Sequence, residues 1–296
     1  MHLSSLPEKN LSWAVVGASV PGASHLQQQL PCQDAHFYEV LPSGWGVAII
    51  ADGAGSAEKA HLGAQFLAQE TGLALRKLLL EPAWVSNKTL PEQDTWQALV
   101  KGSLLPIKQK LDALALRLGI ALKELSATLL GLIFGPSGLL ALHIGDGRSA
   151  YQDAQGNWHA LTRPWKGEYA NETVFFASDI WSEDRLDQYL NTRRVEGSIQ
   201  AFALLSDGCE RHSFVCNVWQ EEEKRFVDPN TPFPNFFNPL VANLRQMYQK
   251  GTQEAEMKEK WEKFLKEGHP RLKTEPDDKT MVLGVFIPSP KALPND

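Results

Sequence analysis

The sequence predicts an α+β fold in which helices pack outside antiparallel β-sheet. Apolar strand runs come first, two long helical patterns follow, and then more strands, a helix pair and one closing strand. A doubly wound parallel sheet would instead alternate strand and helix along the chain. At 296 residues the chain can bury a substantial core. We therefore expect antiparallel sheets covered by helices.

The first part of the chain contributes three strands and both long helices. Strands are expected at 11–20, 34–41 and 44–51, helices at 56–80 and 95–118, and a loop at 84–94. The second and third strands flank a short Pro-Ser-Gly turn and read as a hairpin. Ser56 is available as the N-cap of the first helix, and Pro106 is a point where the second can break.

After residue 125 the pattern changes to strands. Four short strands are expected within 126–162, further strands at 172–178 and 199–206, helices at 239–250 and 252–267, and a closing strand at 279–287. The tract 211–238 is irregular, and it reads equally as a flap over a site or as a long surface loop. We expect one domain over 1–296, with a core of about 12–287.

Composition narrows the classes of function. A net charge of −6 and a pI near 5.8 argue against a nucleic-acid or anionic-membrane partner, since both would favour a basic face. The opening MHLSSLPEKN lacks the pattern of a signal peptide, and no apolar run approaches a membrane span. Cys32, Cys209 and Cys216 form no CxxC pair, so we expect a reducing cytoplasm.

Aspartates recur where strands begin or end. Asp52, Asp146 and Asp207 each follow an apolar run and precede a glycine, Asp277 and Asp278 come just before the closing strand, and Asp34 opens a strand. Asp-Gly is a common hairpin dipeptide, and this alone suffices for Asp146. It suits Asp52 poorly, because a helix follows. Taken together, the acids predict a carboxylate cluster at one edge of antiparallel sheets.

Clustered carboxylates repel one another unless a cation neutralises them. Oxygen ligands without His or Cys suit hard ions such as Mg²⁺ or Mn²⁺. Two such ions about 4 Å apart can activate water and clamp phosphate oxygens. The residues therefore favour metal-assisted hydrolysis of a phosphate ester.

Five motifs now become recognisable as a set. CQDAHF, ADGAGSA, IGDGRSA, LLSDGCE and DDKTMVLGVF resemble, in this order, the motifs of the metal-dependent type 2C serine/threonine protein phosphatases. PGASHLQQQLPCQDA and KGEYANETVFF are similar to a bacterial subgroup of that family. The resemblance spans roughly 12–287. It implies a four-layer α-β-β-α sandwich of two antiparallel sheets flanked by helices.

The resemblance also implies a metal site. Asp52 would bridge two ions of Mn²⁺ or Mg²⁺, and the carbonyl of Gly53 would join the second. Asp207 and Asp277 would hold the first ion. The reaction it implies is direct attack on phosphorus by a metal-bound hydroxide.

The resemblance implies supporting roles at the metal site for three further acids. Asp34 would lie in the outer shell and position metal-bound water. Asp146 matches an acid that serves an additional, weaker metal. Asp278 falls where many relatives have Asn, and it is expected to support the site.

Two positions depart from the family pattern. Gln29 stands near the place where many members carry an Arg that grips phosphate, and Ala54 replaces a His thought to protonate the leaving group. His25 is the candidate for either role, although a lone His before a strand is more often structural. The sequence assigns no substrate-binding residue.

We compare three candidate functions for the chain. The first is a phosphatase acting on phosphoserine or phosphothreonine of a protein substrate, with a cognate kinase as a candidate partner. The second is a catalytically weak or silent module of the same fold that binds a phosphoprotein or regulates a partner; the missing Arg and His motivate it. A nucleotide cradle at 52–57 is disfavoured, because the GK[ST] ending is absent.

Overall fold

Two five-stranded antiparallel sheets face each other in the computed structural model, which describes residues 12–81, 89–165, 173–222 and 224–288. The first sheet has the order β1 (Ser12–Val20), β14 (Lys279–Ile287), β9 (Ile199–Leu205), β6 (Arg148–Asp153) and β7 (Trp158–Ala160). The second has the order β2 (Ala35–Val40), β3 (Gly46–Ala51), β4 (Leu129–Gly135), β5 (Gly138–Ile144) and β8 (Asn191–Glu196).

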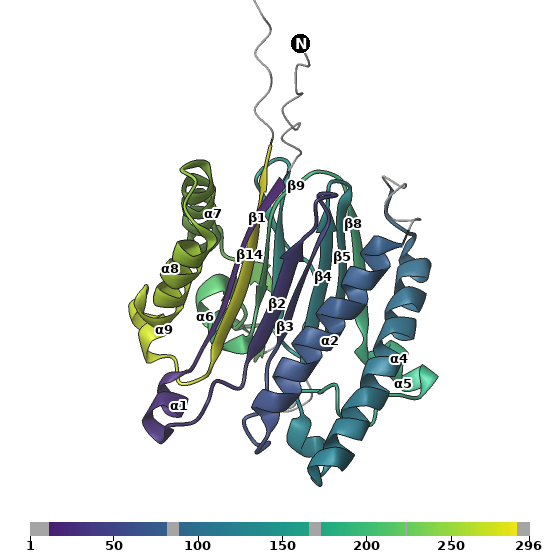
Figure 1. Cartoon of the computed structure of the whole chain (residues 1–296). Helices are drawn as coiled ribbons and strands as arrows, with labels where there is room; N and C mark the ends of the chain where they lie inside the picture. Colours follow the sequence, from purple (N-terminus) through teal and green to yellow (C-terminus); the bar gives the residue numbers. More distant parts are fainter. Residues whose placement is uncertain (1–11, 82–88, 166–172, 223, 289–296) are drawn as a thin grey trace, which may run out of the picture.

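Helices cover the outer face of each sheet (Figure 1). α2 (Ala60–Leu80) and α4 (Gln93–Leu118) pack on the second sheet, and α7 (Pro234–Gln249) and α8 (Glu254–Glu267) pack on the first. This confirms the four-layer α-β-β-α sandwich that the motifs implied. The layers arise because each sheet has two apolar faces, one for its helices and one for the other sheet.

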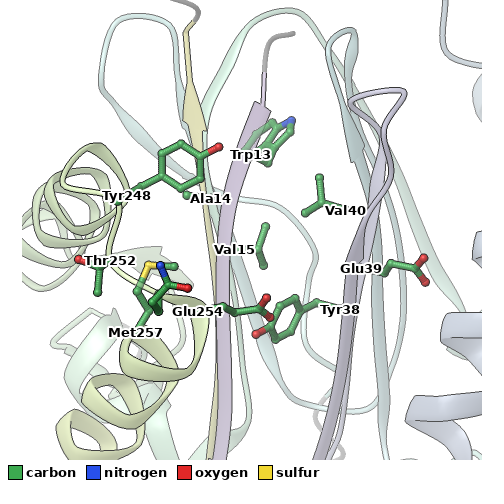
Figure 2. Close-up of a pocket in the computed structure, with 12 residues that line it drawn as sticks. Trp13, Ala14, Val15, Tyr38, Glu39, Val40, Tyr248, Thr252, Glu254 and Met257 are labelled. Carbon is green, nitrogen blue, oxygen red and sulfur yellow. The ribbon is translucent and has the colours of Figure 1, made fainter. Parts of the chain in front are cut away.

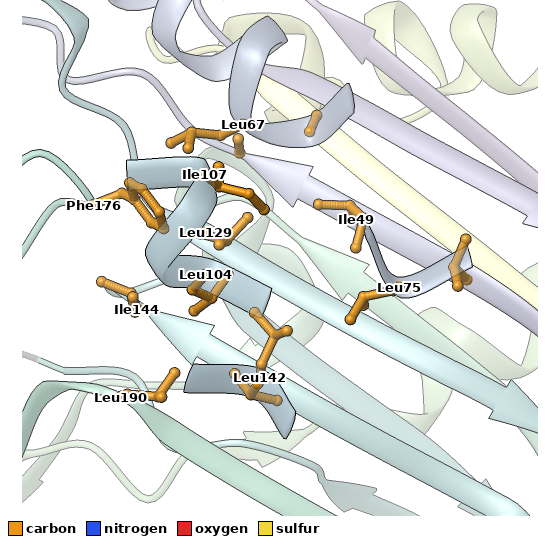
Figure 3. Close-up of a cluster of buried hydrophobic side chains, with 14 of the residues drawn as sticks. Ile49, Leu67, Leu75, Leu104, Ile107, Leu129, Leu142, Ile144, Phe176 and Leu190 are labelled. Carbon is orange, nitrogen blue, oxygen red and sulfur yellow. The ribbon is translucent and has the colours of Figure 1, made fainter. Parts of the chain in front are cut away.

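Three apolar layers hold the sandwich together. Between the sheets, Trp13, Phe134 and Phe202 form an aromatic cluster with ring centroids 4.6–5.4 Å apart. Between the second sheet and its helices, side chains such as Leu75 and Leu104 interdigitate with strand residues (Figure 3). Truncating a fully buried leucine in such a layer costs about 2–5 kcal/mol.

Both long helices differ in detail from the sequence prediction. Ser56 does not cap α2: the helix starts at Ala60, the N-cap is Lys59, and no side chain caps it. The preceding residues form turns in which the amide of Ala60 donates to the carbonyl of Ala57. α4 continues through Pro106 without ending. Leu104 and Ile107 on either side are buried, and this packing offsets the missing amide hydrogen bond.

Several short elements escaped prediction. They are α1 (Ala23–Gln28), η1 (Leu122–Leu125), α5 (Glu183–Tyr189), α9 (Pro270–Thr274) and β8. The strand expected at 172–178 is wrong for the residues described, 173–178: they form a turn in which Phe176 is fully buried against the helical layer. Burial of alternate residues looks the same in a strand and in such a packed turn. Residue 172 and part of the expected loop, 82–88, lie outside the described residues.

The tract 211–238 is more regular than expected. It contains the end of α6 (Glu210–Ser213), β10 (Phe214–Val215) paired with β13 (Thr231–Pro232), and β11 (Val218–Gln220) paired with β12 (Arg225–Val227). α7 begins at Pro234. The tract is therefore two small strand pairs carried on the first sheet.

A groove of about 700 Å³ opens where β1 and β2 lie side by side, next to the turn between α7 and α8 (Figure 2). Its lining includes Trp13, Tyr38 and Tyr248. Trp13 is near the start of β1, whereas the predicted acids lie beyond the other end of that strand. In the part of the chain that the structure describes, no helix is long and apolar enough to cross a membrane.

Candidate active site

Strand register brings the acids to one end of the sandwich. Ala35 of β2 pairs with Ala51 of β3, so Asp34 and Asp52 lie next to each other, one residue beyond that pair. Arg148 of β6 pairs with Leu205 of β9, and the same antiparallel progression leads toward Asp146 and Asp207. In antiparallel sheets the start of one strand meets the end of its neighbour. The aspartates that begin and end strands therefore gather at one edge.

The last strand adds two more acids to this edge. β14 pairs with β1 from Lys279 opposite Val20, and with β9 from Met281 opposite Leu205. Asp277 and Asp278 immediately precede β14, so they lie at the same end of the first sheet. Asp278 is buried, while Asp277 is exposed.

The segment after Asp52 is fixed by backbone pairing. The amide of Thr128 donates to the carbonyl of Asp52 at 2.8 Å, and the amide of Ala54 donates to the carbonyl of Ser126 at 2.9 Å. This pattern makes Gly53 and Ala127 a bridge pair whose own amide and carbonyl groups point away from each other. The carbonyl of Gly53 is therefore not used in the pairing.

Close packing explains the glycine at position 53. A Cβ there would lie 2.6 Å from the carbonyl oxygen of Gln33 and 2.9 Å from Cβ of Ala60. Gly55 is different, since a Cβ would meet nothing within 4 Å. Of these two glycines, only Gly53 is required by close packing. A phosphate-binding loop is not needed to explain them.

Burial and mutual repulsion raise the pKa of three of these carboxyls. Burial, followed by the charges of Asp34, Asp207 and other acids of the edge, raises the pKa of Asp52 well above its usual range. Burial and Asp278 raise the pKa of Asp34 to about 8. Burial and Asp277 raise the pKa of Asp207 to about 7. A cation would relieve this repulsion.

Ser206 positions Asp34. Its hydroxyl donates to Oδ2 of Asp34 at 2.8 Å, and the hydroxyl oxygen accepts from the amide of Thr280 at 2.9 Å. Asp34 is buried. The acid is therefore held between the end of β9 and the start of β14.

Asp278 organises the backbone around the site. Its Oδ1 accepts from the amide of Gly22 at 2.8 Å, and its Oδ2 accepts from the amide of Gln33 at 2.5 Å. The same Oδ1 lies 2.8 Å from Nδ1 of His25 on α1. One buried carboxylate thus ties α1 and the residue before Asp34 to the start of β14.

The bond to Asp278 also fixes the ring of His25, which is half-buried. Nδ1 is the donor toward a carboxylate, so Nε2 is the ring atom able to exchange a proton. Gln29 lies at the exposed end of α1, and Ala54 is buried.

The oxygen atoms of these acids are suitable ligands for a divalent cation, but their side chains are not positioned as a complete ligand set. The oxygen donors and their raised pKa values are what Mg²⁺ or Mn²⁺ would stabilise. However, no group of three or more His, Cys, Asp or Glu side chains among the described residues is arranged to hold a metal ion. Side-chain rotation at Asp52, Asp207 and Asp277 would have to close the ligand set.

Two glycines allow other segments to pack closely against the backbone just before β14. A Cβ at Gly22 would lie 2.2 Å from the carbonyl oxygen of Asp277. A Cβ at Gly208 would lie 1.9 Å from the carbonyl oxygen of Asp278. The positions of both acids therefore depend on bare backbone at Gly22 and Gly208.

We expect Gly22→Ala to displace Asp277 and weaken the site. The added methyl group must push the backbone of 276–277 away, which costs about 1–3 kcal/mol of folding free energy. Urea unfolding measures this loss, and titration calorimetry with Mn²⁺ measures the accompanying drop in affinity. Gly55→Ala is the matched control, because its methyl group enters open space. If Gly22→Ala matched the wild type in stability and in Mn²⁺ affinity, the proposed need for close backbone packing at Gly22 would be contradicted.

Arg148 follows the turn at Asp146, where an arginine would commonly be solvated. Its side chain is fully buried. Nε and Nη2 donate to Oε2 of Glu210 at 3.0 and 2.8 Å, and Nη2 donates to Oδ2 of Asp228 at 2.6 Å. Nη1 donates to Oδ1 of Asn230 at 2.7 Å. Arg148 is the first residue of β6 and lies two residues after Asp146. The network therefore joins this end of β6 to the tract 211–238.

Sequence reasoning missed residues whose signals are weak. Ser206 and Thr128 hold Asp34 and Asp52, yet each is an ordinary hydroxyl residue next to a strand. Gly208 follows Asp207 in a dipeptide that is common in turns, and its role in a close backbone approach is not visible in the local sequence. These roles become visible only when the segments that contact the three residues, which are distant in the sequence, are known.

Two comparisons of the amino-acid sequence find proteins similar to this chain. The family model described as protein phosphatase 2C matches residues 21–266. Serine/threonine-protein phosphatase 3 of Escherichia coli (strain K12) is 30% identical over 282 residues, covering 93% of this chain and 99% of that protein.

Solved structures agree in fold. The catalytic domain of the serine/threonine protein phosphatase PstP, in complex with two manganese ions, superposes with a TM-score of 0.55 and 15% identity. That match covers 94% of this chain and 100% of the other. Serine/threonine phosphatase Stp1 from Staphylococcus aureus gives a TM-score of 0.53 at 13% identity, covering 93% and 95%.

Proposed function

The chain belongs to the protein phosphatase 2C family, and from this premise we propose that it hydrolyses phosphoserine and phosphothreonine in proteins with two Mn²⁺ or Mg²⁺ ions. The family and the curated relative make the chain a protein phosphatase. The observation that carries the metal proposal is a set of carboxyls, buried at Asp34 and half-buried at Asp52 and Asp207, whose pKa values are raised by their low exposure and by one another. The similar PstP domain was solved with two manganese ions.

Each acid takes a defined role in this proposal. Asp52 would be a ligand shared by the two ions, Asp207 and Asp277 would hold the first, and the carbonyl of Gly53 would join the second. Support for Gly53 comes from its bridge pairing, in which its carbonyl is not used. Asp146 would hold an additional, weaker ion.

Bound ions supply Lewis-acid activation of water and neutralise phosphate charge. The chain's own residues must orient the reactants. Asp34, held by Ser206, is placed to accept a hydrogen bond from the attacking water. Asp278 positions the backbone at Gly22 and Gln33 and orients His25.

His25 is proposed as the proton donor to the departing serine or threonine oxygen, or as a group that holds phosphate. The support is its Nδ1 contact with Asp278, which leaves Nε2 for proton transfer. This would compensate for Ala54 and Gln29, which cannot donate a proton or carry a charge.

A metal-dependence assay on peptides tests the proposal. We expect Mn²⁺-dependent release of phosphate from phosphoserine and phosphothreonine peptides, with much slower release from a phosphotyrosine peptide. His25→Ala should lower kcat by roughly 100-fold, as is typical for loss of a general acid. It should lower kcat more for alkyl phosphates than for an aryl phosphate, whose leaving group needs less protonation.

Two outcomes would contradict the proposal. Hydrolysis that is unchanged by a chelator would exclude the metal role of the acids. Absence of hydrolysis together with tight binding of phosphopeptide would instead favour the silent module. An unchanged kcat in His25→Ala would remove His25 from the reaction while leaving the metal proposal intact.

A further inference from the structure

A small hairpin with an exposed aromatic pair stands beside the acidic edge. β11 and β12 pair Trp219 with Phe226, whose rings lie 5.1 Å apart at 64°. Their exposed fractions are 47% and 62%. Exposed aromatic residues that contact each other are costly to leave in water and are enriched at recognition surfaces.

The base of the hairpin is held rigidly by Arg148. Asp228 directly follows β12, and both Asp228 and Asn230 accept hydrogen bonds from the buried guanidinium. Nδ2 of Asn230 donates to the carbonyl of Thr162 at 3.0 Å. The hairpin and the segment beginning at Thr162 are thus fixed relative to each other.

Both segments are also fixed relative to the acids. The amide of Trp165 donates to the carbonyl of Gly145, the neighbour of Asp146, at 2.7 Å. Glu210, which binds Arg148, contributes to the raised pKa of Asp207. The hairpin therefore stands next to the place where a phosphorylated residue would react.

A pocket of about 460 Å³ lies between the two segments. Its lining residues are Arg163, Pro164, Arg225, Phe226, Val227, Asp228 and Asn230. Arg163 and Arg225 therefore line the same pocket, in a protein whose net charge is −6. Asp228, which accepts from Arg148, belongs to the same lining.

We propose that Arg163 and Arg225 bind the carboxylate of an Asp or Glu that flanks the phosphorylated residue of the substrate, while Phe226 packs on the aliphatic part of that side chain. The proposal rests on the phosphatase function above and adds a substrate preference to it. Planar guanidinium groups bind carboxylates through paired, charge-assisted hydrogen bonds. The acidic edge repels an acidic peptide, and the two arginines offset that repulsion locally.

Matched peptides provide the test. One series carries a single Glu at each position flanking the phosphoserine in turn, and a second series carries Gln at the same positions. For the wild type we expect kcat/KM to favour Glu over Gln by about five- to tenfold at the best position, mainly through KM. The preference should shrink as salt is raised.

Variants connect the preference to the pocket. Arg163→Gln and Arg225→Gln should each reduce the Glu/Gln ratio to about twofold or less, and the double variant should abolish it. Arg117→Gln, on the exposed end of α4, is the control and should keep the wild-type ratio. Because each ratio compares two peptides on one protein, a change in folding or metal loading cancels.

Three results would overturn the inference. They are a wild-type ratio near one at every position, a ratio that survives both arginine substitutions, and an equal loss in Arg117→Gln. Hydrolysis of both peptide series at equal rates leaves the phosphatase function standing. Failure to hydrolyse any peptide contradicts the phosphatase function itself, so the two failures are distinguishable.

Discussion

We expect Asp52→Asn to abolish Mn²⁺-dependent hydrolysis of an aryl phosphate. Asn offers one neutral oxygen where the proposal requires a carboxylate shared by two ions. Loss of that stabilisation should lower kcat by at least about 10³-fold, equivalent to several kcal/mol. Steady-state kinetics at saturating Mn²⁺ measure the effect, with Asp112→Asn on the exposed face of α4 as the control. Activity within threefold of wild type would remove Asp52 from the metal site.

The same substitution should stabilise the metal-free protein at neutral pH. The folded-state pKa values of Asp34 and Asp207, about 8 and about 7, exceed the usual 3.8. Between pH 3.8 and these values the folded state binds protons that the unfolded state has lost. Stability of the metal-free protein therefore falls as pH rises through this window.

Removing one carboxyl relieves part of this cost. At pH 7.5 without metal, Asp52→Asn should unfold at higher urea than wild type, by on the order of 1 kcal/mol. Mn²⁺ should reverse the order by stabilising the wild type alone. Loss of activity combined with lower metal-free stability would indicate a damaged fold and not a missing ligand.

Arg148→Met should cost about 3–5 kcal/mol of folding free energy. The change removes a fully buried cation and leaves the carboxylates of Glu210 and Asp228 facing each other without it. Urea unfolding gives the magnitude. Limited proteolysis should show new cleavage within 214–230, because the strand pairs of that tract lose their attachment to β6.

A surface arginine serves as the control for this experiment. Arg185 pairs with the exposed Asp179, and Arg185→Met should change stability by less than about 0.5 kcal/mol. Arg148→Lys keeps the charge but cannot reproduce the forked contacts, so it should fall between wild type and Arg148→Met. Equal stability of Arg148→Met and Arg185→Met would contradict the proposed importance of the network.

The fold was predictable where local pattern and burial agree. β14 occupies the expected range, 279–287, because a run rich in β-branched and other apolar residues follows two aspartates. The four strands within 126–162 were recognisable by the Gly-rich turns between them. The edge strand β8 was not, because its residues are mostly polar and only partly buried. Its position depends on pairing with β5, which local sequence does not encode.

The candidate site was predictable as a set of acids but not as a network. Repetition of Asp-Gly after apolar runs indicated Asp52, Asp146 and Asp207 as a group. The partner of Asp278 could not be foreseen, because its hydrogen bonds reach back more than 240 positions to Gly22 and Gln33. The burial of Arg148 could not be foreseen for the same reason: its three partners follow it by more than 60 positions.

The order of strands in the first sheet has a consequence during synthesis. Among the described residues β1 is the first strand to be made, its neighbour in that sheet is β14, and β14 is made after all the others. β14 must insert between β1 and β9, and it brings Asp277 and Asp278 with it. Contacts this distant along the chain form slowly. A nascent chain therefore cannot assemble the acidic edge until β14 has left the ribosome.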